Sequence, residues 1–336
     1  MNPMDTPSTP AASSQKLALS SDPLISIVVP AFNETENIPV LHERLQAVFE
    51  NELFHRWELI LVDDGSRDNS WNTICELCQR HDNVRGIRLS RNFGHQYALM
   101  AGLEHAAGDA VVTMDCDLQH PVEMLPQMIE AWKEGHQIVK MVRQDAPHTA
   151  LLKKWTSRLY YGLFTWLSDV PMRPGLADFR LIDRQVLEEL KRFQEEGLFL
   201  RGLIEWVGFR ACELPYQAAD RLKGTSQYSI HKMLKLAWHG ISSFSILPLR
   251  IGMLFGIAGT VLSVLGILYA LYGKWIQGEV VPGWASIVMG TSLLFSLLFV
   301  YLGILGEYIG RIVIEVRNRP RFIVMEKKGF PRHPNG

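Results

Sequence analysis

Residues 110–121, AVVTMDCDLQHP, contain an unusual combination of an apolar run and two closely spaced carboxylates. The stretch begins with apolar and β-branched residues, typical of a buried strand, and it ends in two carboxylates, Asp115 and Asp117. Residues at i and i+2 of an extended segment face the same side, so both carboxylates can approach one cation. Gln119 adds a neutral oxygen two residues further on. We therefore expect a divalent ion, Mg²⁺ or Mn²⁺, at Asp115, Asp117 and Gln119. Because a D-x-D pair also arises by chance, the surrounding elements have to support this interpretation.

An alternation of strands and helices extends on both sides of this stretch. Apolar runs typical of strands occupy residues 25–30, 57–64, 84–90, 110–117 and 137–143, and helical patterns separate them. Continuous apolar strands that alternate with helices indicate an α/β fold whose mostly parallel sheet is covered on both faces. In such sheets, ligands bind beyond the carboxyl ends of the strands.

Polar residues gather at these strand ends. Glu34 follows the first strand, Asp63 and Asp64 end the second, and Arg143 ends the fifth. Each one alone reads as ordinary turn chemistry, but the set indicates a shared ligand. No G-x-G-x-x-G segment follows the first strand and the sequence has no Walker lysine loop, which disfavours a dinucleotide cofactor or a P-loop ATPase. A metal ion that neutralises a diphosphate explains the acidic residues better.

Two long apolar stretches follow the α/β pattern. Residues 251–272 and 284–305 contain no charged residue, and each reaches the about 20 apolar residues that a membrane-spanning helix needs. Two such runs are uncommon inside a soluble core, so we expect two transmembrane helices. Basic residues such as Arg250 and Arg311 flank their outer ends, whereas the connection between them contains only Lys274 and the acidic Glu279. The positive-inside rule then places the large N-terminal domain and both termini in the cytoplasm.

The composition divides the chain into five parts. We expect a disordered tail rich in Ser, Thr, Pro and Ala over residues 1–23, without the features of a signal peptide, and an α/β domain over residues 24–228. Residues 229–248 have one apolar stripe and form an amphipathic helix at the membrane surface. The two spans lie within residues 249–306, and residues 307–336 form a basic tail. With 34 basic and 35 acidic residues, the chain shows no charge excess that points to nucleic acid.

Several segments together resemble the GT-A glycosyltransferases of family 2. They are VVPAFNETENIP, LILVDDGSRDNS, LSRNFGHQYALMAGLEHAAGDAVVTMDCDLQHP and VKMVR, in this order. The chain looks most like the branch that moves a sugar from a nucleotide to a polyprenyl phosphate. That branch includes dolichol-phosphate mannosyltransferases and the bacterial undecaprenyl-phosphate glucosyltransferases of O-antigen modification. The bacterial subgroup also has two C-terminal spans and a tail similar to residues 305–324, LGEYIGRIVIEVRNRPRFIV.

The resemblance implies a nucleotide-sugar site, with UDP-glucose as the favoured donor and a bacterial inner membrane as the location. The donor-binding positions that it implies are Pro30, Phe32, Glu34, Val62, Asp64, Asp115, Asp117, Gln119, Arg143 and Arg221. The sequence departs from the family pattern at Gln227, where relatives usually have a lysine. A neutral amide does not replace that charge, so Lys223, Lys232 or a different set of donor contacts takes its place.

A segment before the apolar stretches is suited to bind a lipid phosphate. Lys153, Ser157 and Arg158 lie on an otherwise bulky and apolar helical pattern. Lys153 and Ser157 are spaced at i and i+4 and share a face, and the family often has a basic residue and a serine at this spacing. The alternative is a surface helix that is attracted nonspecifically to anionic lipid.

The resemblance also implies an inverting displacement by the lipid phosphate, with Asp117, Arg143 and Asp178 as catalytic candidates. Asp178 matches the usual candidate base of the bacterial relatives. A phosphate monoester has a second pKa of about 6 and is largely a dianion at neutral pH, so a strong base is unnecessary. We therefore expect Asp178 to have an orienting role.

Other functions are compatible with the same residues. The donor could be GDP-mannose or a UDP-aminosugar, and a membrane protein that binds a nucleotide sugar without catalysis is a rival of another class. A processive polysaccharide synthase is disfavoured, because such enzymes usually have more spans and a Q-x-x-R-W motif, which this sequence lacks. Two spans and a tail also offer surface for a homo-oligomer.

Overall fold

The computed structural model of the chain describes six continuous segments. They are residues 22–51, 56–143, 176–193, 200–217, 283–317 and 319–331, with ten further positions between 257 and 275.

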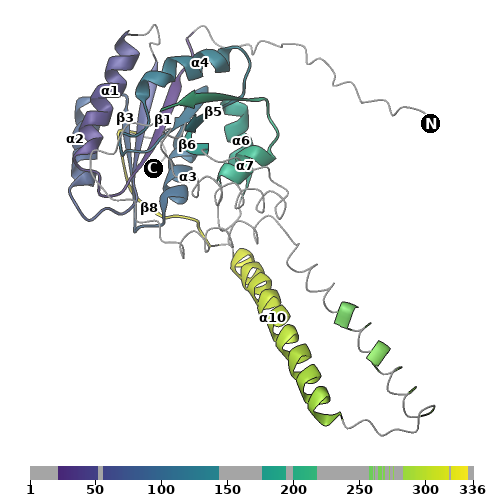
Figure 1. The fold of residues 1–336 in the computed structure, drawn as a ribbon. Coiled ribbons are helices and arrows are strands. Elements are labelled where there is room, and N and C mark those ends of the chain that lie inside the picture. Colours follow the sequence, from purple (N-terminus) through teal and green to yellow (C-terminus); the bar gives the residue numbers. More distant parts are fainter. Residues whose placement is uncertain are drawn as a thin grey trace, which may run out of the picture.

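An eight-stranded sheet forms the centre of the N-terminal domain (Figure 1). Its strands are β1 (Ile25–Ala31), β2 (Trp57–Asp63), β3 (Val84–Leu89), β4 (Ala110–Thr113), β5 (Ile138–Arg143), β6 (Leu176–Asp183), β7 (Ala211–Tyr216) and β8 (Val324–Lys328). They are arranged in the order β7-β5-β6-β4-β1-β2-β3-β8. The four strands β4, β1, β2 and β3 are parallel, and so are β5 and β7, whereas β6 and β8 run antiparallel to their neighbours. The predicted mostly parallel α/β sheet is confirmed, and the antiparallel strands were not predicted.

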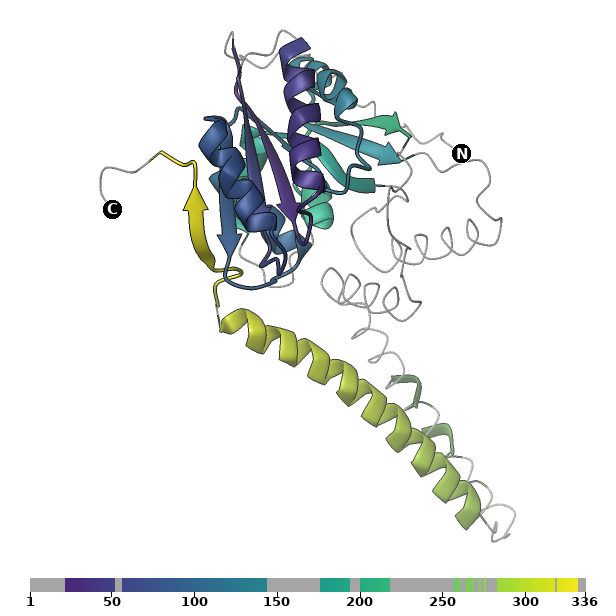
Figure 2. The same ribbon diagram turned by 90° about the vertical axis from the view of Figure 1, so that its left-hand side faces the viewer.

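Helices cover both faces of this sheet, as Figure 2 shows from the side. The first face packs against α1 (Asn37–Asn51), α2 (Ser70–Arg80) and α4 (Leu125–Lys133), and a short 3-10 turn, η1 (Val122–Met124), precedes α4. The second face packs against α3 (His95–His105), α6 (Arg184–Arg192) and α7 (Leu200–Trp206). Every residue of β1 is buried, because a central parallel strand faces helices on both sides.

Helix α3 lies unusually close to the sheet. A Cβ at Gly102 would come within 2.3 Å of the Val28 side chain and 3.1 Å of the Val62 side chain, so only glycine permits this packing. The close packing places the first turn of α3, which begins at His95, at the carboxyl edge of the central strands.

The C-terminal segment adds the last strand to the sheet. Strand β8 pairs antiparallel with β3, and the indole Nε1 of Trp71 donates a hydrogen bond of 3.1 Å to Glu326. It covers the edge of β3, which would otherwise expose unpaired backbone groups. Residues 307–336 were expected to be a basic tail, and the sequence VMEKK of β8 has too few β-branched and aromatic residues to predict a strand.

Gly329, at the end of β8, offers a test of this pairing. It has φ +74°, and a Cβ there would lie 2.3 Å from the carbonyl oxygen of Val84. Gly329→Ala is therefore expected to weaken the pairing of β8 and to lower the melting temperature, measured in detergent by intrinsic fluorescence. Gly208→Ala is the matched control, because Gly208 has φ +70° with its nearest atom 3.9 Å away. Both variants incur about 1–2 kcal/mol of backbone strain, so equal melting temperatures would contradict the expectation.

A long apolar helix projects from the domain (Figures 1 and 2). Helix α10 spans Trp284–Val316, and its part Leu293–Val316 is long and apolar enough to cross a membrane, with no share of it buried inside the protein. The predicted second span, residues 284–305, lies within α10, but the spanning part extends further toward the C-terminus. Most of the predicted first span, residues 251–272, lies outside the described residues. A second crossing and the cytoplasmic location of both termini stay predictions.

Candidate functional site

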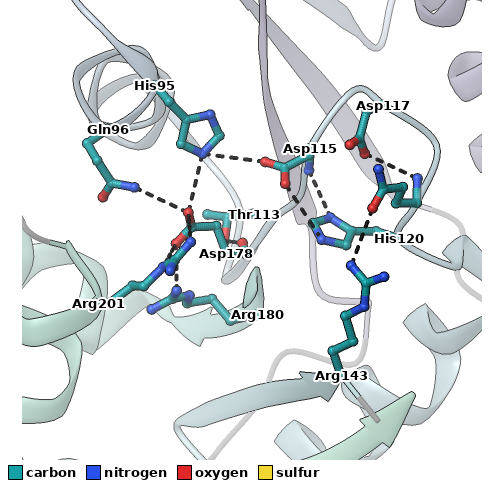
Figure 3. A network of polar contacts seen from close by, with 11 residues as sticks. His95, Gln96, Thr113, Asp115, Asp117, His120, Arg143, Asp178, Arg180 and Arg201 are labelled. Atoms are coloured by element: carbon teal, nitrogen blue, oxygen red, sulfur yellow. Dashed lines mark hydrogen bonds and ion pairs between the residues drawn. The ribbon is translucent and has the colours of Figure 1, made fainter. Parts of the chain in front are cut away.

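The carboxyl ends of the parallel strands form one edge at which the polar side chains meet. Strands β1, β2, β4 and β5 all end there, because β6 separates β4 from β5 and runs antiparallel to both. The first residues of β6 therefore lie at the same edge, which brings Asp178 close to the end of β4. Figure 3 shows the resulting network of side chains from β4, β5, β6, α3 and α7.

The acidic pair lies in a turn after β4 and not on the strand itself. Strand β4 ends at Thr113, so the expectation of an extended segment through Asp117 is wrong. The chain turns instead at Leu118, which has φ 60°, an uncommon value for a residue other than glycine. Asp117 Oδ1 accepts a hydrogen bond of 3.2 Å from the backbone N–H of Gln119 and so stabilises this turn.

Arg143 lies beside this turn. Its Nη1 donates to Oε1 of Gln119 over 3.4 Å, a long bond that links the end of β5 to the loop after β4. The amide Nε2 of Gln119 is buried and has no hydrogen-bond partner. Three positions that sequence alone assigned to one ligand therefore lie together: the acidic turn, Gln119 and Arg143.

Glu34 adds a third carboxylate to this edge. Burial raises its pKa, Asn37 opposes the rise by donating a hydrogen bond of 2.5 Å, and the nearby negative charges of Asp117, Asp68 and Asp115 raise the pKa further. An accumulation of carboxylates costs electrostatic energy, which a bound cation would relieve.

The Asp115 and Asp117 carboxylates fit a hard divalent cation whose remaining ligands are supplied by a substrate and by water. Asp115 Oδ1 is buried and has no hydrogen-bond partner, so an oxygen of the type that Mg²⁺ and Mn²⁺ prefer is available. Within the described segments, no group of three or more His, Cys, Asp and Glu side chains is arranged to hold a metal by itself. Mg²⁺ is commonly bound by one or two carboxylates, with substrate phosphates and water in the remaining positions.

Two histidines flank Asp115. His120 Nδ1 accepts the backbone N–H of Asp115 over 3.0 Å, and its Nε2 lies 3.7 Å from Asp115 Oδ2. Because Nδ1 is an acceptor, the proton of the neutral ring is on Nε2 and faces the carboxylate. Burial lowers the pKa of His120, and the charges of Asp115, Asp117 and Asp178 oppose this. On the other side, His95 Nε2 lies 3.4 Å from Asp115 Oδ1.

Asp178 is buried and held by cations. Arg201 donates to both of its oxygens at 2.8 Å, and Arg180 donates to Oδ1 at 2.8 Å. Burial alone would raise its pKa, but the hydrogen bonds from Arg201 and His95 and the charges of Arg201 and Arg180 hold the pKa of Asp178 far below its ordinary value. A carboxylate in this environment is a weak base, which agrees with the orienting role that we expect for it.

The remaining donor-binding candidates differ in their exposure at this edge. Phe32 is 43% exposed at the edge, whereas Pro30 and Val62 are buried, and Val62 packs against α3. Asp64 is also buried, and its two oxygens accept the backbone N–H groups of Phe93 and Gly94 at 2.8 and 3.0 Å. Its carboxylate therefore holds the loop before α3.

The candidates that would contact phosphate beyond this edge lie outside the described residues. They are Arg221, Lys153, Ser157 and Arg158, together with the predicted interfacial helix of residues 229–248 and the substitution at Gln227. Their roles stay predictions.

Sequence reasoning did not single out His95, His120 or Arg201. His95 and His120 lie within segments on which the family resemblance rests, LSRNFGHQYALM and DCDLQHP, so their positions beside known motif residues were the available signal. No local signal exists for Arg201, because α7 meets Asp178 only through the tertiary fold.

Comparisons with known proteins found a matching family model and several similar proteins. Residues 26–191 match the family model described as glycosyl transferase family 2. The chain is 39% identical over 308 residues to an uncharacterized glycosyltransferase, YkcC, of Bacillus subtilis, which covers 91% of this chain and 94% of the relative. It is 37% identical over 316 residues to the SfII prophage-derived bactoprenol glucosyl transferase of Shigella flexneri, covering 92% and 99%, and 36% identical over 310 residues to the prophage bactoprenol glucosyl transferase homolog of Escherichia coli, covering 90% and 99%.

Among solved structures, mannosyl-3-phosphoglycerate synthase from Rubrobacter xylanophilus is similar with a TM-score of 0.47 and 14% identity. This match covers 66% of the present chain and 73% of the other.

Proposed function

We propose that this chain, which belongs to glycosyl transferase family 2, transfers one glucose from UDP-glucose to the phosphate of a polyprenyl lipid. The enzyme class follows from the family, and the names of relatives that match over at least 90% of this chain support a polyprenyl-phosphate acceptor. The observation that carries the proposal is the convergence of Asp115, Asp117, Gln119 and Arg143 at one edge of the sheet. A hydrophobic helix, α10, that is suited to a bilayer supports a lipid acceptor.

The donor diphosphate is proposed to bind at this edge. Asp115, Asp117 and Gln119 would hold a divalent ion, Mg²⁺ or Mn²⁺, whose chemistry is to neutralise the charge of the leaving nucleoside diphosphate. Arg143 extends from the end of β5 toward Gln119 and would place a fixed positive charge beside the same phosphates. Phe32 and Glu34, just beyond β1, would contact the nucleoside, and Arg221 would reach the phosphates from the later segment.

The transfer is proposed to be inverting and to need no strong base. The lipid phosphate oxygen attacks the anomeric carbon, the bond from that carbon to the nucleoside diphosphate breaks, and the diphosphate leaves with the electron pair. A phosphate monoester with a second pKa of about 6 is largely a dianion at neutral pH, so it carries no proton that the enzyme has to remove. The hydrogen bonds of Asp178 agree with this, because both of its oxygens already accept from arginine side chains.

The acceptor is proposed to reach the site from the membrane surface. Lys153, Ser157 and Arg158 would bind the lipid phosphate, and the amphipathic residues 229–248 would lie in the bilayer interface. In this proposal the active site would lie at the cytoplasmic leaflet of the bacterial inner membrane, next to two transmembrane spans. It would give a lipid-linked sugar for the modification of a cell-envelope glycan.

A donor screen tests this function. Membranes that contain the protein are incubated with undecaprenyl phosphate and radiolabelled UDP-glucose, UDP-N-acetylglucosamine or GDP-mannose, and the organic phase is analysed for a labelled lipid. We expect UDP-glucose to label the lipid and the other donors to label it at least about tenfold less, since polar contacts to the sugar and base discriminate strongly. A labelled lipid from GDP-mannose or the aminosugar alone would reassign the donor. No labelled lipid from any donor would refute the proposed transfer.

A further inference from the structure

A second layer of polar side chains lies behind the acidic turn, and the proposed reaction does not use it. It consists of His95 and Gln96 at the start of α3, Asp178 and Arg180 on β6, and Arg201 on α7 (Figure 3). Asp178 and Arg180 are each 4% exposed and so are removed from water, whereas the side chains of His95 and Arg201 reach the surface. Buried charges are costly to keep unless they are paired and hydrogen-bonded, and this layer contains both signs.

Asp178 is the centre of this layer. Its Oδ1 accepts from Arg201 Nε and from Arg180 Nη2, each at 2.8 Å, and its Oδ2 accepts from Arg201 Nη2 at 2.8 Å and from Gln96 Nε2 at 3.2 Å. The backbone carbonyl of Asp178 also accepts the Thr113 hydroxyl at 2.6 Å, which fixes it to the last residue of β4. Bidentate hydrogen bonds from an arginine leave a carboxylate little freedom to rotate.

His95 connects this fixed carboxylate to Asp115. Its Nε2 lies 3.4 Å from Asp178 Oδ2 and 3.4 Å from Asp115 Oδ1. The ring nitrogen carries one N–H, so it can direct that bond to either carboxylate but not fully to both. Asp115 Oδ1 makes no hydrogen bond of normal length in this arrangement, and it is buried. The His95 ring therefore lies against the Asp115 carboxylate, and Asp115 Oδ1 still has an acceptor position that a cation can use.

We propose that His95 is a positioning residue that orients the Asp115 carboxylate for the divalent cation, and that Asp178 holds His95 in place. The inference rests on the proposed function, because it assigns Asp115 to the cation. It gives Asp178 a different task from that of a base: the carboxylate, clamped by Arg201 and Arg180, supplies the rigid acceptor against which the His95 ring is set. Partners that orient the ligands of a metal ion typically alter its affinity by about 10–100-fold when they are removed.

The chain offers well-matched variants for a test. His95→Ala removes the N–H, whereas His95→Gln keeps a side-chain N–H donor, so its retention of function would identify hydrogen bonding and not ring packing as the cause. His105→Ala is the control, because His105 ends the same helix, hydrogen-bonds to the carbonyl of Ala101 within α3 and contacts the Phe330 ring edge-on, away from the site. The His95 side chain is 42% exposed, so its removal leaves the core intact.

The primary measurement is the affinity for Mn²⁺ in the presence of UDP, followed by electron paramagnetic resonance on the full-length protein in detergent. We expect His95→Ala to weaken Mn²⁺ binding by about 10–100-fold, with His95→Gln within about threefold of the unaltered protein and His105→Ala unchanged. Asp178→Asn is expected to weaken Mn²⁺ binding as well, and the double variant with His95→Ala should be no weaker than the worse single variant, since both act through one contact.

Several outcomes would overturn the inference. Unchanged Mn²⁺ affinity in His95→Ala would refute the positioning role, and so would equal losses in the alanine and glutamine variants. If Asp178→Asn folds, shown by its melting temperature, and abolishes sugar transfer with Mn²⁺ affinity unchanged, Asp178 acts in the reaction and does not hold His95. If Asp178→Asn does not fold, the three histidine variants decide the matter. A protein that binds Mn²⁺ and UDP as expected but forms no lipid product would refute the proposed function while leaving this inference standing.

Discussion

Asp117→Asn is expected to abolish sugar transfer to lipid phosphate while leaving membrane insertion and folding intact. The substitution keeps the size of the side chain and removes one negative charge from the edge at which Asp115 and Glu34 also lie. A neutral amide is a poor ligand for a hard divalent cation, so the charge of the leaving diphosphate would no longer be neutralised. Loss of comparable charge stabilisation typically lowers the rate by about 10²–10³-fold.

The measurement is the initial rate of labelled lipid formation, with the amount of membrane-inserted protein quantified in the same sample. Glu123→Gln is the matched control, because it also neutralises one carboxylate close to the acidic turn, but Glu123 is exposed and pairs with Arg44 at 2.8 Å. Exposed pairs of this kind contribute about 0–1 kcal/mol, so this variant should retain nearly full activity. Retention of more than about a tenth of the activity by Asp117→Asn would refute a metal role for Asp117, given the expected size of the loss.

Removal of divalent ions should have an equally large effect. Excess chelator is expected to stop lipid labelling, and added Mg²⁺ or Mn²⁺ should restore it, because the described residues supply carboxylates at the edge but no complete set of ligands. The cation should then bind well only together with the diphosphate. Full activity in excess chelator would refute the assignment of a divalent ion to Asp115 and Asp117.

Thermal unfolding separates this arrangement from a structural metal site. A ligand that binds only the folded state stabilises it by RT ln(1 + L/Kd), where L is the free ligand concentration, so the melting temperature rises with that concentration. We expect Mn²⁺ alone to leave the melting temperature almost unchanged, and Mn²⁺ with UDP to raise it. A large rise with Mn²⁺ alone would mean that the protein holds the ion without the nucleotide, contrary to the arrangement at Asp115 and Asp117.

Much of the sheet could be predicted because its information is local. The sequences of β1 to β5 are short, apolar and separated by helical patterns, so each strand can be recognised from its own residues as a buried element. Strands β6, β7 and β8 lack this signal. Strand β7 alternates weakly and contains a proline, and β8 is mostly charged, so both depend on pairing with a partner that is distant in sequence.

The strand pattern predicted that Asp115, Gln119 and Arg143 share one edge, because the carboxyl ends of parallel strands point the same way. The residues behind that edge follow from contacts between elements that are distant in the chain. Gln96 and Asp178 are 82 residues apart, and Trp71 and Glu326 are 255 residues apart, yet each pair forms a hydrogen bond. No periodicity encodes such contacts, since they arise when an antiparallel strand is inserted between β4 and β5 and when the chain returns to β3 after α10. The acidic pair could thus be predicted from its spacing. The turn at Leu118 and the hydrogen bonds from Arg201 to Asp178 depend on packing between elements that are remote in the chain.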